Sequence, residues 1–348
     1  MRQLAHLFDD KHAGLRGKLI GLYAILIAAN LGVWAWAIAA FGGNVVLIGT
    51  ALLAYGLGLR HAVDADHIAA IDNVTRKLMQ DGKRPIGVGF FFALGHSTVV
   101  IIAGGAIALT ADSLNARFPG LIESAGALGT AISASFLLAI AALNGVVLLS
   151  VYRSFQQARR GSAAAPFQLD SLLGRRGLLP RLFRRLFKLI ASSWHMYPLG
   201  FLFGLGFDTA SEIGVLGIAA SEAAKGLSIE SILVFPALFT AGMSLIDATD
   251  GVLMLGAYGW AFAEPARKLY YNLAVTGISV VVALVIGSIE ALGLVGEKLG
   301  LVGGVWEAIA AAAGDLGMLG YMIVALFALT WLISLLVYRL KAPRKIGV

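Results

Sequence analysis

Residues 59–73 read LRHAVDADHIAAIDN and combine the end of a membrane-like apolar run with a dense group of ionisable side chains. A charged side chain at the centre of a bilayer costs about 2.5–3.5 kcal/mol, so a cluster of this kind indicates a functional site. A polar helix end at the membrane interface would explain one or two such residues, but not so many in one stretch. The group consists of Arg60, His61, Asp64, Asp66, His67 and Asp72.

The composition of the chain places most of it in lipid. Of its 348 residues, 59% are hydrophobic and only 14% are charged, which is far from the average of soluble proteins. The net charge of +7 does not indicate nucleic-acid binding, because basic residues of a membrane protein report its orientation. The chain has no cysteine, which excludes thiolate metal sites and leaves imidazole, carboxylate, thioether and backbone oxygen as possible ligands.

We predict an all-α, polytopic membrane protein that forms one transmembrane domain over residues 1–348. A helix needs about 20 apolar residues to cross the hydrocarbon layer. Eight segments satisfy this requirement, namely 18–41, 45–75, 86–110, 127–151, 197–220, 231–258, 269–293 and 317–339.

Most Lys and Arg residues fall in alternate connections between these segments, beginning with the N-terminal tail. The positive-inside rule then predicts that both termini are cytoplasmic. The longest connection, 152–195, is predicted to be a basic cytoplasmic loop. Its second half alternates basic and apolar residues at helical spacing, so a second hypothesis is that it lies along the lipid surface.

The helical phase of the second segment suggests a metal site. At about 100° per residue, His61, Asp64 and His67 share one helical face, and Asp72 returns to the azimuth of His61. Asp66 points elsewhere and is expected to meet a neighbouring helix or to orient an imidazole. Imidazole combined with carboxylate suits nickel, cobalt or zinc and is a poor match for calcium or magnesium.

Further ionisable residues lie in or near three other apolar segments, and these are His96, Asp208, Glu212, Asp247 and Asp250. His96 is predicted as an additional ligand, although a hydrogen-bonded core histidine is the simpler alternative. The four carboxylates, with Arg60, are predicted to line a pathway or to support the ligands. Pairing with Arg60 and helix packing are the alternatives for them.

A short internal sequence repeat relates the two halves of the chain. GLGLRHAVD at 56–64 aligns with GLGFDTASE at 204–212, and LGHS at 94–97 aligns with AGMS at 241–244. The paired segments run in opposite directions in the predicted topology, which is the pattern of an inverted repeat in transporters. We therefore expect one site to be built by spans two, three, five and six.

Four motifs in these spans, RHAVDADHI, LGHSTVV, LGFDTASE and GMSLIDATDG, resemble the signatures of the nickel/cobalt transporter (NiCoT) family. The resemblance covers the whole chain. It implies an eight-span, secondary-type permease of the bacterial cytoplasmic membrane that takes up Ni²⁺ or Co²⁺ with high affinity. The metal would then be the transported substrate, with no catalytic cofactor. The sequence carries no Walker-type phosphate loop, so any use of ATP would need another subunit, and a secondary-type permease implies no such ATPase subunit.

The resemblance also assigns roles to individual residues. It places the metal on the second span, at His61, Asp64, Asp66 and His67. It associates Asn30 in the first span and Val63 beside the first motif with a preference for nickel over cobalt. Two positions depart from the family pattern, with Ser211 in place of Thr and Ala248 in place of Thr, but both motifs keep their carboxylates.

Two other classes of protein could use such residues. A membrane metalloenzyme with a His/Asp centre is the main alternative, but His-rich di-iron sites need more histidines than this chain offers in its spans. Three of the six histidines, His6, His12 and His195, fall in predicted cytoplasmic segments. A metal sensor is the other alternative, and carboxylates in four separate spans favour a pathway instead. We therefore expect a permease and not an enzyme.

Overall fold

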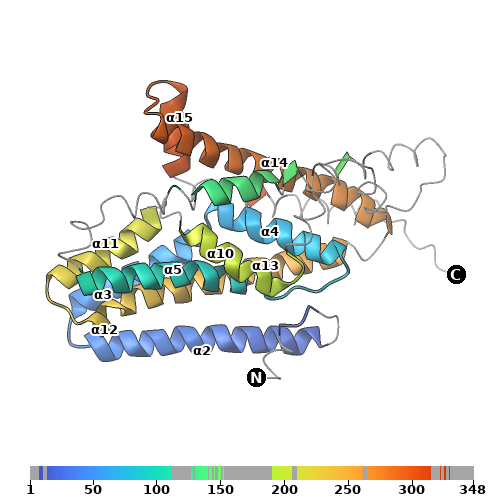
Figure 1. Cartoon of the computed structure of the whole chain (residues 1–348). Coiled ribbons are helices and arrows are strands. Elements are labelled where there is room, and N and C mark those ends of the chain that lie inside the picture. Colours follow the sequence, from blue (N-terminus) through green and yellow to red (C-terminus); the bar gives the residue numbers. More distant parts are fainter. Residues whose placement is uncertain are drawn as a thin grey trace, which may run out of the picture.

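The structure is a computed structural model that describes residues 8–10, 14–110, 190–205, 210–261 and 265–314, with parts of 127–152 and 322–329. Its regular elements in these ranges are all helical (Figure 1). They are α2 (Leu15–Phe41), α3 (Val45–His61), α4 (Ala65–Gln80), α5 (Val88–Thr110), the 3-10 turn η1 (Ser193–His195), α10 (Met196–Gly204), α11 (Ala210–Ala224), α12 (Ile229–Ile232), α13 (Val234–Ala261), α14 (Pro265–Lys298) and α15 (Val305–Gly314).

Several of these helices are long and apolar enough to cross a membrane. The described residues contain four such spans, and α3 with α4 adds a fifth if the bent pair counts as one. The four are Leu15–Phe41, Val88–Ile107, Ile229–Gly259 and Gly277–Lys298. Large apolar side chains on α2 and α14 point outward, as shown by Leu31 at 67% and Val281 at 59% exposure. Such surfaces suit lipid, so the chain is a multi-pass membrane protein.

The structure corrects the prediction of one continuous helix over 45–75. Helix α3 ends at His61, α4 begins at Ala65, and the two axes differ by 49°. Asp64 is the N-cap of α4, with φ −64° and ψ 145°, and Asp66 lies in the first turn. Both are recognised start signals for a helix, since acidic groups there complement the exposed N–H groups and the helix dipole.

Three other predicted spans are described only in part. The segment 197–220 contains α10, which ends at Gly204, and α11, which begins at Ala210, and residues 206–209 between them lie outside the described residues. The fourth span, 127–151, is described only in part, and the eighth span, 317–339, lies almost entirely outside the described residues. The same holds for most of the predicted basic loop 152–195, of which Tyr152 and residues 190–195 are described.

Helix α13 is the centre of the bundle and packs against α2, α3, α4, α5 and α11. Figure 1 shows α2 along one side of the bundle and α14 along the opposite side. The approach of α3 to α13 is very close, because a Cβ atom on Gly58 would lie 2.1 Å from the backbone oxygen of Phe239. The same relation holds between Gly200 on α10 and the backbone oxygen of Phe92 on α5, also at 2.1 Å. Small residues of this kind let membrane helices pack backbone to backbone.

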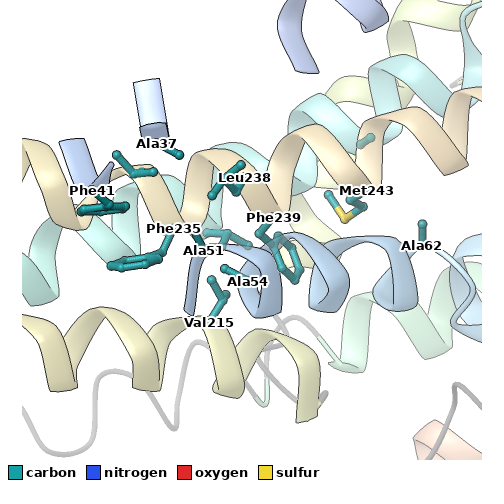
Figure 2. Close-up of a cluster of buried hydrophobic side chains, with 13 residues drawn as sticks. Ala37, Phe41, Ala51, Ala54, Ala62, Val215, Phe235, Leu238, Phe239 and Met243 are labelled. Carbon is teal, nitrogen blue, oxygen red and sulfur yellow. The ribbon is translucent and has the colours of Figure 1, made fainter. Parts of the chain in front are cut away.

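A cluster of buried apolar side chains fills the space between α2, α3, α11 and α13 (Figure 2). Its labelled members include Phe41, Ala54, Val215, Phe235 and Phe239. The ring of Phe239 lies 5.3 Å from the ring of His61. The apolar core therefore reaches the histidine that ends α3 and fixes one side of the site.

Candidate metal site

Three histidine rings from three different helices meet inside the bundle. His61 ends α3, His67 lies in the first turn of α4, and His96 lies in the middle of α5. Their ring centroids are separated by 4.6 Å for His61 and His67, and by 4.8 Å for each of them with His96. Each ring offers a nitrogen within 4.8 Å of the other two. All three are buried, at 1%, 0% and 2% exposure.

The break between α3 and α4 determines how His61 is oriented. Its Nδ1 atom lies 2.8 Å from Oδ2 of Asp64, the N-cap of α4. The Asp64 side chain does not cap the helix, because it is held by the imidazole and by Arg60. A proton on Nδ1 donated to this carboxylate leaves Nε2 of His61 with a lone pair directed toward the other histidines.

His67 is oriented in the same way by a different helix. Its Nδ1 atom lies 3.2 Å from Oδ2 of Asp247 on α13, and its Nε2 atom has no hydrogen-bond partner among the described residues. The ring of Phe92 packs perpendicular to the imidazole, with the ring centroids 4.8 Å apart, and places an apolar surface on that side. His67 therefore also presents Nε2 as its available nitrogen.

His96 connects the histidine group to Glu212 on α11. Its Nε2 atom lies 2.7 Å from Oε1 of Glu212 and 3.0 Å from Nε2 of His61. The same carboxylate oxygen is 4.0 Å from Nε2 of His61. Three nitrogen donors and one buried carboxylate oxygen thus face one small volume, which is a donor set that suits first-row divalent metals.

Arg60 lies at one edge of this cluster. Its Nη1 atom is 3.2 Å from Oδ1 of Asp64 and donates to Oγ of Ser211 at 2.8 Å. Arg60 thus contacts Ser211, the residue that precedes Glu212 in the chain. Asp208 lies outside the described residues.

The helical phase predicts that Asp72 lies on the same face as His61. The structure does not bring Asp72 to the histidines. Asp72 is fully buried, and its Oδ1 accepts a hydrogen bond from Tyr258 on α13. The cause is the 49° bend between α3 and α4, which breaks the continuous phase on which that prediction depended. Asp250, also on α13, has an Oδ2 atom without a hydrogen-bond partner among the described residues.

The sequence did not reveal two further buried residues near Asp72, namely Tyr258 on α13 and Arg76 on α4. Tyr258 carries no charge and resembles an ordinary membrane aromatic in the sequence. Arg76 falls among the basic residues of a predicted cytoplasmic connection, yet it is completely buried and donates to Oδ1 of Asn73 at 2.6 Å. The helical pattern of apolar and polar residues continues beyond residue 75, and α4 extends to Gln80. This pattern was the signal that could have placed Arg76 on a helix.

The remaining predicted residues lie around the cluster. Asp66 is buried at 8% exposure, and its Oδ1 has no hydrogen-bond partner among the described residues. Val63 lies in the link between α3 and α4 and packs against an apolar group that includes Ile68. Asn30 lies on α2 and is joined by hydrogen bonds to Tyr55 and to the backbone of Ala241.

A multi-pass helical bundle that buries three imidazoles and several carboxylates where its helices meet is the arrangement expected of a membrane transport protein for metal ions. Comparison with known proteins makes this specific. The family model described as high-affinity nickel-transport protein (NicO) matches residues 47–337. The chain belongs to this family.

Relatives of the chain agree with the assignment. It is 56% identical to the high-affinity nickel transport protein of Cupriavidus necator, over 94% of this chain and 93% of the relative. It is 44% identical to the high-affinity nickel-transport protein NixA of Helicobacter pylori, over 86% and 90%. It is 42% identical to the cobalt transport protein NhlF of Rhodococcus rhodochrous, over 95% and 93%. No solved structure matches the chain.

These matches decide between the classes of protein considered from the sequence. The family and the relatives are transport proteins, and a membrane metalloenzyme finds no support among them. A metal ion is accordingly a substrate of this family and not a catalytic cofactor.

Proposed function

We propose that this protein takes up Ni²⁺ with high affinity across the bacterial cytoplasmic membrane, and that Co²⁺ is a second substrate. The observation that carries the proposal is the triangle of buried imidazoles, in which two rings are held by carboxylates at 2.8 and 3.2 Å. The nickel and cobalt transporters among its relatives support the choice of metals.

The ligands that we propose are the three histidines and Glu212. Nε2 of His61 and Nε2 of His67 are the nitrogens left available by Asp64 and Asp247. His96 and Glu212 contribute the other two donors, and an entering ion would replace the contacts that now join them to His61. Carboxylates that hold the second ring nitrogen fix the tautomer of a histidine ligand and raise its basicity.

The other carboxylates would line the route of the ion and would not be ligands at the histidine site. Asp72 and Asp250 follow His67 and Asp247 along α4 and α13, so they would receive the ion after it leaves the imidazoles. This changes the roles of Asp72 and Asp66, which the sequence placed among the metal residues, to residues of the pathway, and leaves Asp208 as a proposed pathway residue.

The glycine contacts support an inverted repeat. Helices α5 and α13 are antiparallel, because Gly104 lies near Pro236 while Gly89 lies near Asp247. Residues of α5 and α13 correspond at a shift of 147, and those of α3 and α10 at a shift of 142. The contacts related by these shifts are Gly242 with Tyr55 and Leu59, Gly95 with Tyr197 and Phe201, Gly58 with Phe239, and Gly200 with Phe92.

The repeat relates α3 and α5 to α10 and α13. Its register at α3 differs from the alignment of 56–64 with 204–212 that the sequence alone suggested, whereas the shift between α5 and α13 is unchanged. A two-fold axis that relates antiparallel membrane helices lies in the membrane plane, which is the symmetry of many transporters. We accordingly retain eight spans and cytoplasmic termini in the proposed topology.

Transport would use the membrane potential, without an ATPase subunit. A divalent ion that crosses 100 mV gains about 4.6 kcal/mol, enough for more than about a thousandfold accumulation. Discrimination between nickel and cobalt is proposed to depend on Asn30 and Val63, as the resemblance to the transporter family implies.

The proposal is tested with purified protein in metal-free liposomes. A potential negative inside should drive accumulation of ⁶³Ni²⁺ without ATP, and His61→Ala should abolish it. His195→Ala is the matched control, because His195 lies in the 3-10 turn before α10, away from the three clustered histidines, where its Nδ1 accepts from the backbone nitrogen of Ala191 at 2.9 Å and its ring packs against Trp194. Wild-type liposomes that gain no interior counts, or a His61→Ala protein that transports normally, would refute the proposal.

A further inference from the structure

A permanent cation is buried beside the route proposed for the metal ion. Arg76 on α4 is completely buried, although charged side chains are almost never fully buried unless they are paired. Its Nη2 atom donates to Oδ1 of Asn73 at 2.6 Å. Its Nε and Nη1 atoms have no hydrogen-bond partner among the described residues. The guanidinium therefore has donors to spare inside the bundle.

Two carboxylates beside this part of α4 also have an unused oxygen atom. They belong to Asp72, which is completely buried one helical turn before Arg76, and to Asp250 on α13. Within the described part of the chain, the Oδ2 atom of each has no hydrogen-bond partner. The turns that carry them are in contact, because a Cβ atom added to Gly251 would lie 3.6 Å from Cγ2 of Ile71. We call Asp72 and Asp250 the exit pair, since the proposed route places them after the imidazoles.

Arg76 can reach the exit pair without a movement of the backbone. Aspartate and arginine four residues apart on a helix lie on the same face and can form an ion pair, and Asp72 and Arg76 have this spacing. Tyr258 on α13 marks the place where they would meet, because its hydroxyl donates to Oδ1 of Asp72 and lies within electrostatic range of Arg76. A change of rotamer is thus enough to move the guanidinium from Asn73 to Asp72.

The charges of the exit pair require a cation at every stage of transport. A divalent ion balances the two carboxylates, whereas the pair without an ion would leave two negative charges buried away from water, which is strongly unfavourable. Arg76 beside the pair reduces this excess to one negative charge. A secondary permease must return in its empty form after each release, so the empty pair has to be tolerated once in every cycle.

We propose that Arg76 is a tethered cation that takes the place of the metal ion on the exit pair after release, and so allows the empty transporter to return. The guanidinium stays with Asn73 while the ion occupies the pair, and it turns to Asp72 when the ion has left. Arg76 is a positioning residue in this cycle and contributes no ligand atom. The inference rests on the proposed function and on the route through the exit pair.

The test compares two modes of transport in liposomes that contain the purified protein. Net uptake is the entry of ⁶³Ni²⁺ into a metal-free interior, driven by a potential negative inside. Exchange is the entry of ⁶³Ni²⁺ into liposomes filled with unlabelled Ni²⁺, and it does not use the empty form. Arg76→Gln should lower net uptake by about tenfold or more, because it leaves buried carboxylates without a positive partner. Exchange by the same variant should stay close to that of the wild type.

Two variants and the wild type serve as controls. Arg16→Gln removes one positive charge from an exposed position in the first turn of α2, and it should change neither mode. Arg76→Lys keeps the charge and should retain more net uptake than Arg76→Gln. In the wild type, where Arg76 assists the return, net uptake and exchange should have rates of the same order.

The outcomes separate this role from others. Equal loss of both modes in Arg76→Gln would overturn the inference and leave Arg76 with a packing role. Unchanged net uptake would also overturn it, because protons would then neutralise the empty pair. If Arg76→Gln does not fold, the wild type decides, since exchange far faster than net uptake would contradict an assisted return. Absence of both modes in the wild type would refute the proposed function, and the inference with it.

Discussion

The carboxylate of Asp247 lies 3.2 Å from Nδ1 of His67, although the two residues are 180 positions apart in the chain. This contact joins α13, the central helix, to the first turn of α4. It is the counterpart of the contact between Asp64 and His61 at 2.8 Å, which is made within one segment. Two histidines thus each have Nδ1 beside a carboxylate, and the two carboxylates come from distant parts of the chain.

Asp247→Asn tests whether this carboxylate supports metal binding. The amide keeps the shape of the side chain but removes the negative charge that stabilises His67 as a ligand. Loss of such a partner typically weakens metal affinity by about 10- to 100-fold, and we expect a change of this size in a Ni²⁺ titration of the purified protein. Asp81→Asn is the control, because Asp81 pairs with Lys77 at the far end of α4. Equal affinities for the two variants would show that Asp247 has only a packing role.

Glu212→Gln tests the proposed fourth donor. Glutamine can still accept a hydrogen bond from His96, but as a neutral amide it is a much weaker ligand for a divalent ion than a carboxylate. We expect the KM of Ni²⁺ uptake to rise by about tenfold or more. Glu222→Gln is the matched control, because Glu222 lies on the same helix and pairs with Lys225 at 2.7 Å. An unchanged KM in Glu212→Gln would remove Glu212 from the ligand set.

Much of the membrane architecture follows from the sequence, because long apolar runs have few other stable conformations. The predicted spans at 18–41, 86–110, 231–258 and 269–293 correspond to α2, α5, α13 and α14. The break at residues 62–64 was not predicted, because the ionisable residues around it were interpreted as metal ligands on one continuous helix. Asp64 and Asp66 are also start signals for a helix, and that second meaning of the same residues marks the beginning of α4.

The sequence indicates which residues could belong to the site, but not which of them contact one another. Each unusual residue stands out because ionisable groups are rare in apolar spans. Which carboxylate holds which histidine depends on how α4, α5, α11 and α13 pack, and no periodicity along one helix contains that information. The fully buried Arg76 was missed for a related reason, since a basic residue near the end of an apolar run is normally cytoplasmic.

Gly58→Ala tests the close packing of α3 on α13. The added Cβ atom would lie 2.1 Å from the backbone oxygen of Phe239, so the helices must move apart. Overpacking of this kind costs about 1–3 kcal/mol or more, and we expect a lower melting temperature of the detergent-solubilised protein and weaker Ni²⁺ binding. Gly56→Ala is the control, because a Cβ atom added there would have nothing within 4 Å. Identical melting curves for the two variants would contradict the packing described for α3.

The absence of cysteine makes single-cysteine labelling a direct test of the proposed topology. Gly43 lies in the exposed connection between α2 and α3, and Gln80 is the exposed last residue of α4. If the N-terminus is cytoplasmic, Gly43→Cys should react with a membrane-impermeant maleimide added to intact spheroplasts. Gln80→Cys should react only after the membrane is permeabilised, because α3 and α4 together cross it. Both variants should retain uptake of ⁶³Ni²⁺, which shows that they are correctly folded. Reaction of both cysteines in intact spheroplasts would mean that α3 and α4 form a re-entrant loop, and the reverse pattern would invert the proposed orientation.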